Sequence, residues 1–403
     1  MTVNIKPSKI QGEVTAPSSK SMGHRLLICA GLAEGKSEIK NILYSEDILA
    51  TLDCLKAMGA EITINDDSVT VVGTLPNVSV GGEFRCRESG STLRFFIPLS
   101  MLSENGALFT GYGRLMERPM GVYEDITNEK NIPYSKTDEG IRVGGTLTAG
   151  KFKVPGNISS QFISGLLFAL PLCQGDSEIE VVGNIESRSY IDMTLQAMSL
   201  FGVDAHRKNE NTLYIRGNQR YKSKTLTVEG DYSNSAFLDA FNYIGGDARV
   251  LGLDVNTLQG DSIYKEYFDL LRQDTPTLDI GNCPDLAPIL MTVAAANNGC
   301  KLINTARLKM KESDRGTVMA QELSKFGADI RVSDNEIIID KARLYTPKDD
   351  LYCHNDHRVV MSLAVLASVY GGRLVGAEAV KKSFPDFFDK VKVLGMEVEI
   401  YDY

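Results

Sequence analysis

Short polar clusters that run directly into an apolar segment of helical length occur seven times along this chain of 403 residues. The clusters lie at residues 17–21, 88–92, 159–161, 231–235, 284–285, 311–315 and 355–358. A helix N-terminus carries unpaired backbone N–H groups and a partial positive charge, so it attracts anions, and added Lys or Arg strengthens that attraction. If several of these helix ends converge, they form one strongly anion-binding pocket.

Ordinary helix capping is the alternative interpretation of each single cluster. Ser, Thr, Asp and Asn are preferred N-cap residues, and a cap stabilises its helix by about 1 kcal/mol. Capping does not explain the cations at these helix starts, where the helix dipole disfavours positive charge. The cations are Lys20, Arg25, Arg94, Lys311, Arg315 and Arg358. We therefore expect a negatively charged group opposite them.

A second pattern alternates with the first: an amphipathic helix, a polar or Gly turn, a short strand, a tight turn and another short strand. Clear copies lie at residues 52–72, 195–216, 323–339 and 391–400, with a weaker copy at 122–143 and a sixth candidate at 267–280. The helix ends recur about every seventy residues, and such a period indicates stacked units that bury a shared core.

Each repeat unit is therefore expected to contain one helix that is apolar on all sides and one that is amphipathic, with strands between them. The apolar helices should be central, and the amphipathic ones should lie outside against sheets. A chain of 403 residues exceeds what one hydrophobic core usually serves. The predicted fold class is α/β, with six βαβαββ units divided between two domains of three.

Composition argues against several classes of function. A net charge of -9 speaks against general binding to nucleic acid or to a membrane surface. The seven cysteines are widely spaced without a Cys-x-x-Cys pair, and the four histidines lack metal-ligand spacing. There is no Walker A sequence and no Gly-x-Gly-x-x-Gly, so we expect neither a metal nor a nucleotide cofactor.

Location and assembly are expected from what the sequence lacks. No apolar run reaches the ~18 residues that span a bilayer. Residues 1–17 lack the apolar core of a signal peptide. We expect a cytoplasmic protein, and a monomer because no long amphipathic surface remains once the repeats are placed.

Two polar clusters combine acids with cations. In the 311–315 cluster, Lys-Glu-Ser-Asp-Arg, helical spacing would place the lysine and the arginine on one face, with the glutamate aside and able to reach a reacting group. A solvated i,i+4 charge cluster is the alternative. In the 355–358 cluster, Asn-Asp-His-Arg, the arginine belongs either to a capping motif or to a fork for phosphate or carboxylate.

Eight short motifs, in order along essentially the whole chain, closely resemble those of the 5-enolpyruvylshikimate 3-phosphate synthase family. They lie at residues 17–21 with Arg25, 90–94, 117–119, 159–161, 187–192, 311–315, 355–358 and 382–386. One such motif alone would be weak evidence. Eight in the family's order are highly specific.

The resemblance implies a two-domain inside-out α/β barrel that closes on substrates held between its domains. Family members cross between domains twice, which places one domain at residues 1–18 and 229–403 and the inserted domain at 19–228. The implied reaction moves the enolpyruvyl group of phosphoenolpyruvate onto the 5-hydroxyl of shikimate 3-phosphate and releases phosphate. It needs no metal or organic cofactor and belongs to the shikimate pathway of aromatic amino acid biosynthesis.

The resemblance also implies two sets of substrate-binding residues. The shikimate 3-phosphate set is Lys20, Ser21, Arg25, Ser159, Ser160, Gln161, Ser187, Tyr190, Asp285 and Lys311. The phosphoenolpyruvate set is Lys20, Gly90, Arg118, Gln161, Arg315, Arg358 and Lys382. Cationic and hydroxyl donors suit phosphate, and a multiply charged anion is costly to desolvate unless it is paired.

Three residues resemble the family's catalytic groups. Asp285 resembles the carboxylate that takes the 5-hydroxyl proton, and Glu312 the one that delivers a proton to the methylene carbon of phosphoenolpyruvate. Lys20 would stabilise the phosphate as it leaves. Addition followed by elimination requires proton traffic at two centres, which two carboxylates in differing environments supply.

Three residues depart from the family pattern. Glu88 and Arg307 stand where many or some members have Asn, which alters the local charge, and both are left out of the expected site. Phe95 stands beside the Gly90 loop, where better-known members carry Pro.

Two rival functions remain. The sister enzyme that attaches enolpyruvate to a UDP-sugar, UDP-N-acetylglucosamine enolpyruvyl transferase, uses a loop cysteine near the Arg118 position and an Asn after its first lysine. Here Ser21 follows Lys20, and residues 111–119 contain no cysteine. A non-catalytic anion-binding repeat scaffold is the other rival, in which the acids Asp285 and Glu312 would have no task.

Overall fold

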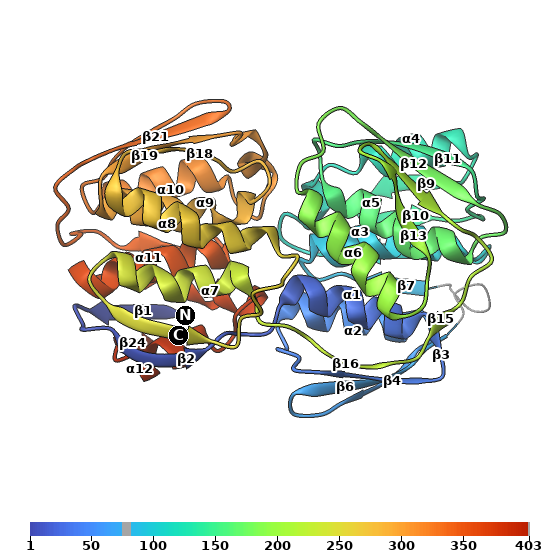
Figure 1. The fold of residues 1–403 in the computed structure, drawn as a ribbon, viewed down its shortest axis with the longest axis horizontal. Helices are drawn as coiled ribbons and strands as arrows, with labels where there is room; N and C mark the ends of the chain where they lie inside the picture. The colour runs from blue at the N-terminus through green and yellow to red at the C-terminus, as the bar shows by residue number, and fades with distance from the viewer. Residues whose placement is uncertain (75–81, 402–403) are drawn as a thin grey trace. The chain divides into compact units, whose positions relative to one another are not determined.

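The computed structural model describes residues 1–74 and 82–401 (Figure 1). The chain forms two compact units. The inserted unit is Lys20–Glu229, and the discontinuous unit combines Met1–Ser19 with Gly230–Tyr403. Both boundaries lie one residue later than the family resemblance implies.

The inserted unit contains three four-stranded sheets with one shared topology. The first sheet has the spatial order β16 (Thr225–Thr227), β4 (Lys36–Lys40), β6 (Ser68–Val72), β5 (Glu61–Ile64). The second has the order β7 (Gly82–Arg85), β8 (Ala107–Thr110), β10 (Gly140–Val143), β9 (Tyr134–Thr137). The third has the order β11 (Lys151–Pro155), β12 (Ser177–Val182), β14 (Thr212–Ile215), β13 (Ala205–Asn209). In each sheet the first two strands are parallel, and an antiparallel hairpin completes the other side. In the second and third sheets the spatial order therefore follows the chain as first, second, fourth, third, whereas in the first sheet β16, from the end of the unit, takes the first place.

Two kinds of helix alternate between these strands, as the sequence predicted. The mostly buried ones are α1 (Lys20–Gly31), α3 (Gly90–Ser100) and α5 (Ser160–Ala169). The amphipathic ones are α2 (Glu46–Ala57), α4 (Gly121–Glu129) and α6 (Arg188–Leu200). Short β3 (Ala33–Glu34), β15 (Tyr221–Lys222), η1 (Leu115–Glu117) and η2 (Leu170–Leu172) complete the unit. Helix α3 packs against α5, and every α3 residue except Ser91 is buried, because its side chains other than that of Arg94 are apolar or small on all sides.

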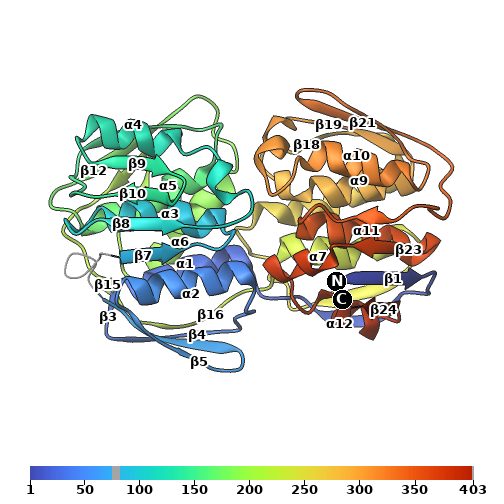
Figure 2. The ribbon, with the colours of Figure 1, turned by 180° about the vertical axis from the view of Figure 1, so that it is seen from behind.

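The discontinuous unit repeats the topology in two sheets. They are β18 (Thr277–Asp279), β19 (Gly299–Ile303), β21 (Glu336–Asp340), β20 (Asp329–Val332); and β22 (Leu351–Tyr352), β23 (Gly372–Val375), β1 (Thr2–Lys6), β24 (Glu397–Tyr401). Strand β1 lies between β23 and β24, so the start of the chain completes a sheet made by its end (Figure 2).

Buried helices again form the interior of the discontinuous unit. They are α7 (Tyr232–Asp239), α9 (Ala287–Ala296) and α11 (His357–Tyr370), and α11 packs against both others. The more exposed helices are α8 (Tyr264–Gln273), α10 (Arg315–Ser324) and α12 (Phe387–Val393). Short 3-10 turns are η3 (Ala240–Tyr243), η4 (Gly260–Ile263), η5 (Pro284–Leu286), η6 (Ala306–Met310) and η7 (Ala377–Lys382).

The sixth repeat unit differs from the expected pattern. Its sheet consists of β17 (Asp247–Leu251) paired in parallel with β2 (Gln11–Thr15). After α8 ends at Gln273, the chain enters β18, which pairs with β19 of the next unit. The intervening residues 274–276 are too few for a hairpin. The sixth candidate at 267–280 was therefore wrong in its two strands.

Candidate functional site

Capping accounts for part of the polar clusters. Five of them supply an N-cap side chain that accepts a bond from the first turn of its helix. The capping residues are Ser89, Ser159, Asp231, Asp314 and Asp356. The cations at the same helix starts have partners of a different kind.

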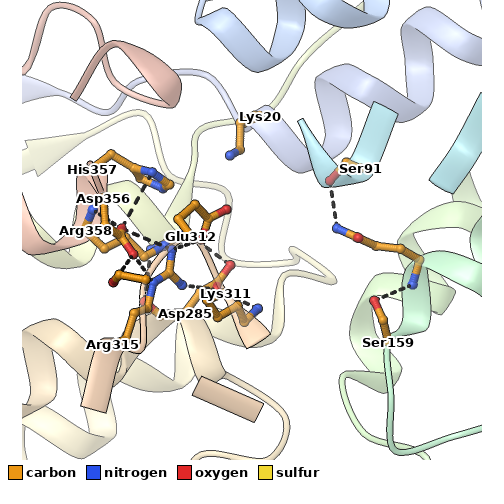
Figure 3. A network of polar contacts seen from close by, with 12 residues as sticks. Lys20, Ser91, Ser159, Asp285, Lys311, Glu312, Arg315, Asp356, His357 and Arg358 are labelled. Atoms are coloured by element: carbon orange, nitrogen blue, oxygen red, sulfur yellow. Dashed lines mark hydrogen bonds and ion pairs between the residues drawn. The ribbon is translucent and has the colours of Figure 1, made fainter. Parts of the chain in front are cut away.

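Arg315, the first residue of α10, is the centre of a charge network in the discontinuous unit (Figure 3). Its Nη1 donates to Asp285 at 2.7 Å, and its Nη2 donates to Glu312 at 2.7 Å. Its Nε donates to Asp356 at 2.8 Å. The guanidinium is 1% exposed, and these carboxylates raise its pKa against the opposing effect of burial. The negative partners expected opposite this cation are thus carboxylates of the protein itself.

Asp285, in η5 just before α9, is surrounded by cations. Lys311 Nζ lies 3.1 Å from its Oδ1, Arg315 Nη1 2.7 Å from the same oxygen, and Arg358 Nη2 3.2 Å from Oδ2. Burial opposes ionisation of Asp285, but the charges of Arg358, Lys311 and Arg315 hold its pKa well below the ordinary value. At neutral pH it is a carboxylate whose charge is already compensated.

The predicted helical face for Lys311 and Arg315 was wrong. Lys311 lies before α10 with extended backbone, φ -87° and ψ -165°, so the pair has no helical spacing. The two side chains nevertheless share a target, because both bind Asp285. Burial lowers the pKa of Lys311, and Asp285 offsets part of that effect.

Asp356 is a central residue that the sequence did not single out. It is fully buried, accepts from the backbone N–H of Arg358 at 3.0 Å as the cap of α11, and accepts from Ser313 Oγ at 3.0 Å. An acid beside an arginine at a helix start was the available signal. At the end of η7, Lys382 Nζ donates to the carbonyl oxygen of Asn355 at 2.7 Å.

In the inserted unit, Lys20 opens α1 and pairs with an acid at the start of α2. Its Nζ lies 2.7 Å from Asp47 Oδ2, and both side chains are mostly buried. Sequence reasoning missed Asp47, which lies 27 residues away in the chain.

Arg25 lies one turn further along α1 and bonds to neutral oxygens. Nε donates to Thr194 Oγ1 at 2.9 Å, Nη1 to the Ser21 carbonyl at 2.6 Å and Nη2 to the Tyr190 carbonyl at 2.9 Å. Burial lowers its pKa to about 10, so Arg25 is charged at neutral pH. A side chain held in this way is suited to an incoming anion.

The first turns of α3 and α5 are joined by polar side chains. Gln161 Nε2 donates to Ser91 Oγ at 2.8 Å, and Gln161 Oε1 accepts from Arg94 Nη1 at 2.7 Å. Gly90 leaves room for Arg118, because a Cβ at residue 90 would lie 2.3 Å from Arg118 Nη1. Of the expected phosphoenolpyruvate residues of this unit, Gly90, Arg118 and Gln161 therefore lie at the start of α3, whereas Lys20 pairs with Asp47.

The remaining expected serines also lie at helix starts. Ser160 is the buried first residue of α5, and Ser187 is a buried residue with φ 57° immediately before α6. Of the residues that depart from the family pattern, Glu88 lies against Gly113, and the buried Arg307 contributes to lowering the pKa of Lys311.

The family model for EPSP synthase (3-phosphoshikimate 1-carboxyvinyltransferase) matches residues 5–391. A 3-phosphoshikimate 1-carboxyvinyltransferase of Clostridium botulinum (strain Eklund 17B / Type B) is 38% identical, over 98% of this chain and 97% of the relative. One of Clostridium perfringens (strain 13 / Type A) is 40% identical, over 98% of each chain.

Solved structures share the fold. An EPSP synthase from Acinetobacter baumannii gives a TM-score of 0.80 at 22% identity, over 99% of this chain and 100% of that one. The enolpyruvyl transferase NikO from Streptomyces tendae gives a TM-score of 0.80 at 14% identity, over 99% of this chain and 98% of that one. In the part of the chain that the structure describes, no helix is long and apolar enough to cross a membrane. With a family model matching nearly its whole length and relatives at 38–40% identity, this chain belongs to the EPSP synthase family.

Proposed function

We propose that this protein transfers the enolpyruvyl group of phosphoenolpyruvate to the 5-hydroxyl of shikimate 3-phosphate and releases phosphate. Family membership supports the overall reaction. The observation that carries the proposed chemistry is the pair of carboxylates, Asp285 and Glu312, bound to the single guanidinium of Arg315. One fixed cation thereby holds two proton-transfer groups close together.

The two carboxylates divide the proton transfers. Asp285 accepts the 5-hydroxyl proton as that oxygen bonds to C2 of phosphoenolpyruvate, while Glu312 gives a proton to C3. In the second half, Glu312 takes a proton back from C3, and the electron pair of that C–H bond restores the double bond as the bond between C2 and the phosphate oxygen breaks. Phosphate leaves with the electron pair of the C–O bond, and the 5-hydroxyl proton held by Asp285 leaves with it. Lys20 stabilises the charge that develops on the departing phosphate.

Anionic substrates would release Asp285 from its three cations. With no substrate, Lys311, Arg315 and Arg358 compensate its charge, so Asp285 is a weak base. A substrate carboxylate that binds Arg315 and Arg358 competes for the same donors. The pKa of Asp285 then rises, and its strength as a base increases when substrate is present.

The other expected residues bind the substrates. Arg25, with the hydroxyls of Ser159, Ser160 and Ser187, supplies donors for shikimate 3-phosphate, together with Ser21, Gln161 and Tyr190. Gly90, Arg118, Gln161, Arg315, Arg358 and Lys382 supply donors for phosphoenolpyruvate. The bonds of Arg25 to Thr194 and of Gln161 to Ser91 support these roles, because they fix the side chains before a ligand arrives.

The protein is proposed to act as a monomer in the cytoplasm, on small anions rather than on nucleic acid. All seven cysteines are buried free thiols, as a reducing compartment permits. The net charge of -9 would repel nucleic acid phosphates.

Phosphate release tests the function. The protein is mixed with phosphoenolpyruvate and either shikimate 3-phosphate or UDP-N-acetylglucosamine, or with each compound alone. Release only with shikimate 3-phosphate is expected. Release with the UDP-sugar would favour the sister activity, and binding without release in any mixture would favour a non-catalytic scaffold.

A further inference from the structure

A chain of buried side chains joins the first three helices of the inserted unit. His24 of α1 contacts Thr51 of α2, with Nδ1 2.7 Å from Oγ1. Thr51 Oγ1 lies 2.9 Å from Thr92 Oγ1 of α3. The Thr92 hydroxyl donates at 2.8 Å to Ser89 Oγ, the cap of α3. All four residues are buried, with at most 1% of their surface exposed.

The direction of every bond in this chain follows from its last member. A hydroxyl has one proton, and Thr92 gives its proton to Ser89. Thr92 therefore accepts from Thr51, and Thr51 in turn accepts from His24. His24 must carry its proton on Nδ1, because with the other tautomer two oxygens 2.9 Å apart would face each other without a proton between them.

The surroundings of His24 keep it neutral. Burial, and then the charges of Lys20 and Arg25, lower its pKa well below the ordinary value. The ring meets Phe95 edge to face, with centroids 6.4 Å apart. Among the described residues, no hydrogen-bond partner meets its buried Nε2. The ring therefore has a single donor, and that donor is directed at Thr51.

The chain of bonds ends at the first turn of α3, beside Gly90 and Gln161 of the proposed phosphoenolpyruvate set. Ser89 Oγ accepts the Thr92 hydroxyl and also the Thr92 backbone N–H, at 3.2 Å. This fixes the first turn of α3, which begins at Gly90. Ser91, in the same turn, accepts from Gln161 at 2.8 Å.

We propose that His24 is a positioning residue for phosphoenolpyruvate, holding the first turn of α3 through a one-way hydrogen-bond chain to Thr51, Thr92 and Ser89. The inference rests on the proposed role of Gly90 and Gln161 in binding that substrate. It assigns no substrate contact to His24 itself.

Substitutions at two links of the chain test the proposal. His24→Leu removes the donor, and Thr51→Val removes the next link at nearly constant shape. Each is expected to raise KM for phosphoenolpyruvate roughly 5- to 20-fold, the effect of one buried hydrogen bond, and to leave KM for shikimate 3-phosphate within about twofold. Because both remove the same chain, the double variant should be no worse than the more affected single variant.

Two further variants serve as controls. His24→Asn places an amide donor near the position of Nδ1 and should restore most of the KM. Ser100→Ala removes a buried hydroxyl at the opposite end of α3, where it donates to Ile97, and should leave both KM values unchanged. Equal losses for both substrates in His24→Leu, or full additivity in the double variant, would overturn the proposal.

Two measurements test the chain of hydrogen bonds independently of catalysis. Nitrogen NMR of the His24 ring in the wild-type protein should show Nδ1 protonated and Nε2 unprotonated at every pH between about 5 and about 9. Amide exchange at residues 90–92 should accelerate in His24→Leu. A protonated Nε2, or unchanged exchange, contradicts the proposal. If the wild-type protein releases no phosphate from the two substrates, the result contradicts the proposed function and not the role of His24.

Discussion

At the scale of single residues, Glu312 tests the proposed chemistry most directly. Glu312→Gln keeps the shape of the side chain but removes the proton that it exchanges, so turnover should fall about 10²- to 10⁴-fold while both substrates still bind. Steady-state kinetics and ligand titration measure the two effects. Glu336→Gln, at an exposed ion pair with Lys301, is the matched control. If Glu312→Gln retained turnover within about twofold, Glu312 would not be the proton donor.

Arg25 offers a second test at this scale. A charge-assisted phosphate contact is worth roughly 1.5–3 kcal/mol, so Arg25→Ala should weaken shikimate 3-phosphate by that amount and phosphoenolpyruvate far less. Calorimetric titration with each ligand measures the difference. Equal losses for both ligands would show that Arg25 serves no particular substrate.

Asp261 gives a pH dependence of stability. Burial and the charge of Asp285 raise its pKa to about 6, against the effect of Arg358. The folded protein thus holds the proton more tightly than the unfolded chain, so the stabilising contribution is full below about pH 4 and is lost as pH rises through about 6. Asp261→Asn should therefore gain roughly 1–3 kcal/mol relative to wild type between about pH 4 and about pH 7. Urea unfolding at both pH values measures this, and a constant difference would contradict it.

For the charge network around Arg315, the sequence predicted the types of residue better than the contacts between their side chains. It placed Arg315 and Asp285 among the expected residues, because both lie in recognisable motifs. The contacts of Asp356 and Asp47 were not predictable, since each is set by tertiary packing between distant segments. The helical spacing of Lys311 failed because α10 starts only at Arg315.

At the scale of elements, Glu322 ties α10 to the segment that leads into α11. It is fully buried and accepts from Lys325 Nζ at 2.6 Å, from the Tyr352 backbone N–H at 2.8 Å, and contacts His354 Nε2 at 3.1 Å. Glu322→Ala removes the acceptor of the Tyr352 N–H and the carboxylate partner of Lys325, whose Nζ keeps only the Asp350 carbonyl, and should lower the free energy of unfolding by about 3–5 kcal/mol. Urea unfolding measures the loss.

The control for Glu322 is an ion pair of similar length on the surface. Glu336 lies 2.6 Å from Lys301, and both side chains are 41% exposed. Glu336→Ala should cost less than about 1 kcal/mol, because water replaces the lost partner. Similar losses in the two variants would mean that burial does not strengthen the role of Glu322.

Helices were more predictable than strand pairing. The apolar and amphipathic helices follow local periodicity, and all six amphipathic copies contain a helix. The pairing of β16 with β4 joins residues 225–227 to residues 38–40, and no local pattern contains that information. That the sixth unit lacks a hairpin became evident only from the pairing of β18 with β19 of the next unit.

At the scale of the whole molecule, β1 and β6 allow a matched comparison of the two units. Each occupies the third place in a four-stranded sheet, and Val3 of β1 and Val71 of β6 are both fully buried. Val3→Ala should accelerate amide exchange in β23 and β24, whereas Val71→Ala should do so in β4 and β5. Hydrogen exchange with mass spectrometry resolves these segments. Equal acceleration in both units by either variant would show that they unfold together.

The position of β1 also sets an order of events on the ribosome. Ile5 pairs with Gly372 and Thr2 with Tyr401, so β1 must wait while more than three hundred residues are translated. At about 5–20 residues per second, that wait is roughly 20–80 s. Residues 20–229 emerge within this interval and hold all the strands that their own sheets need. The nascent inserted unit can therefore fold while the apolar side chains of β1, Val3 and Ile5, wait without their sheet partners until translation supplies them.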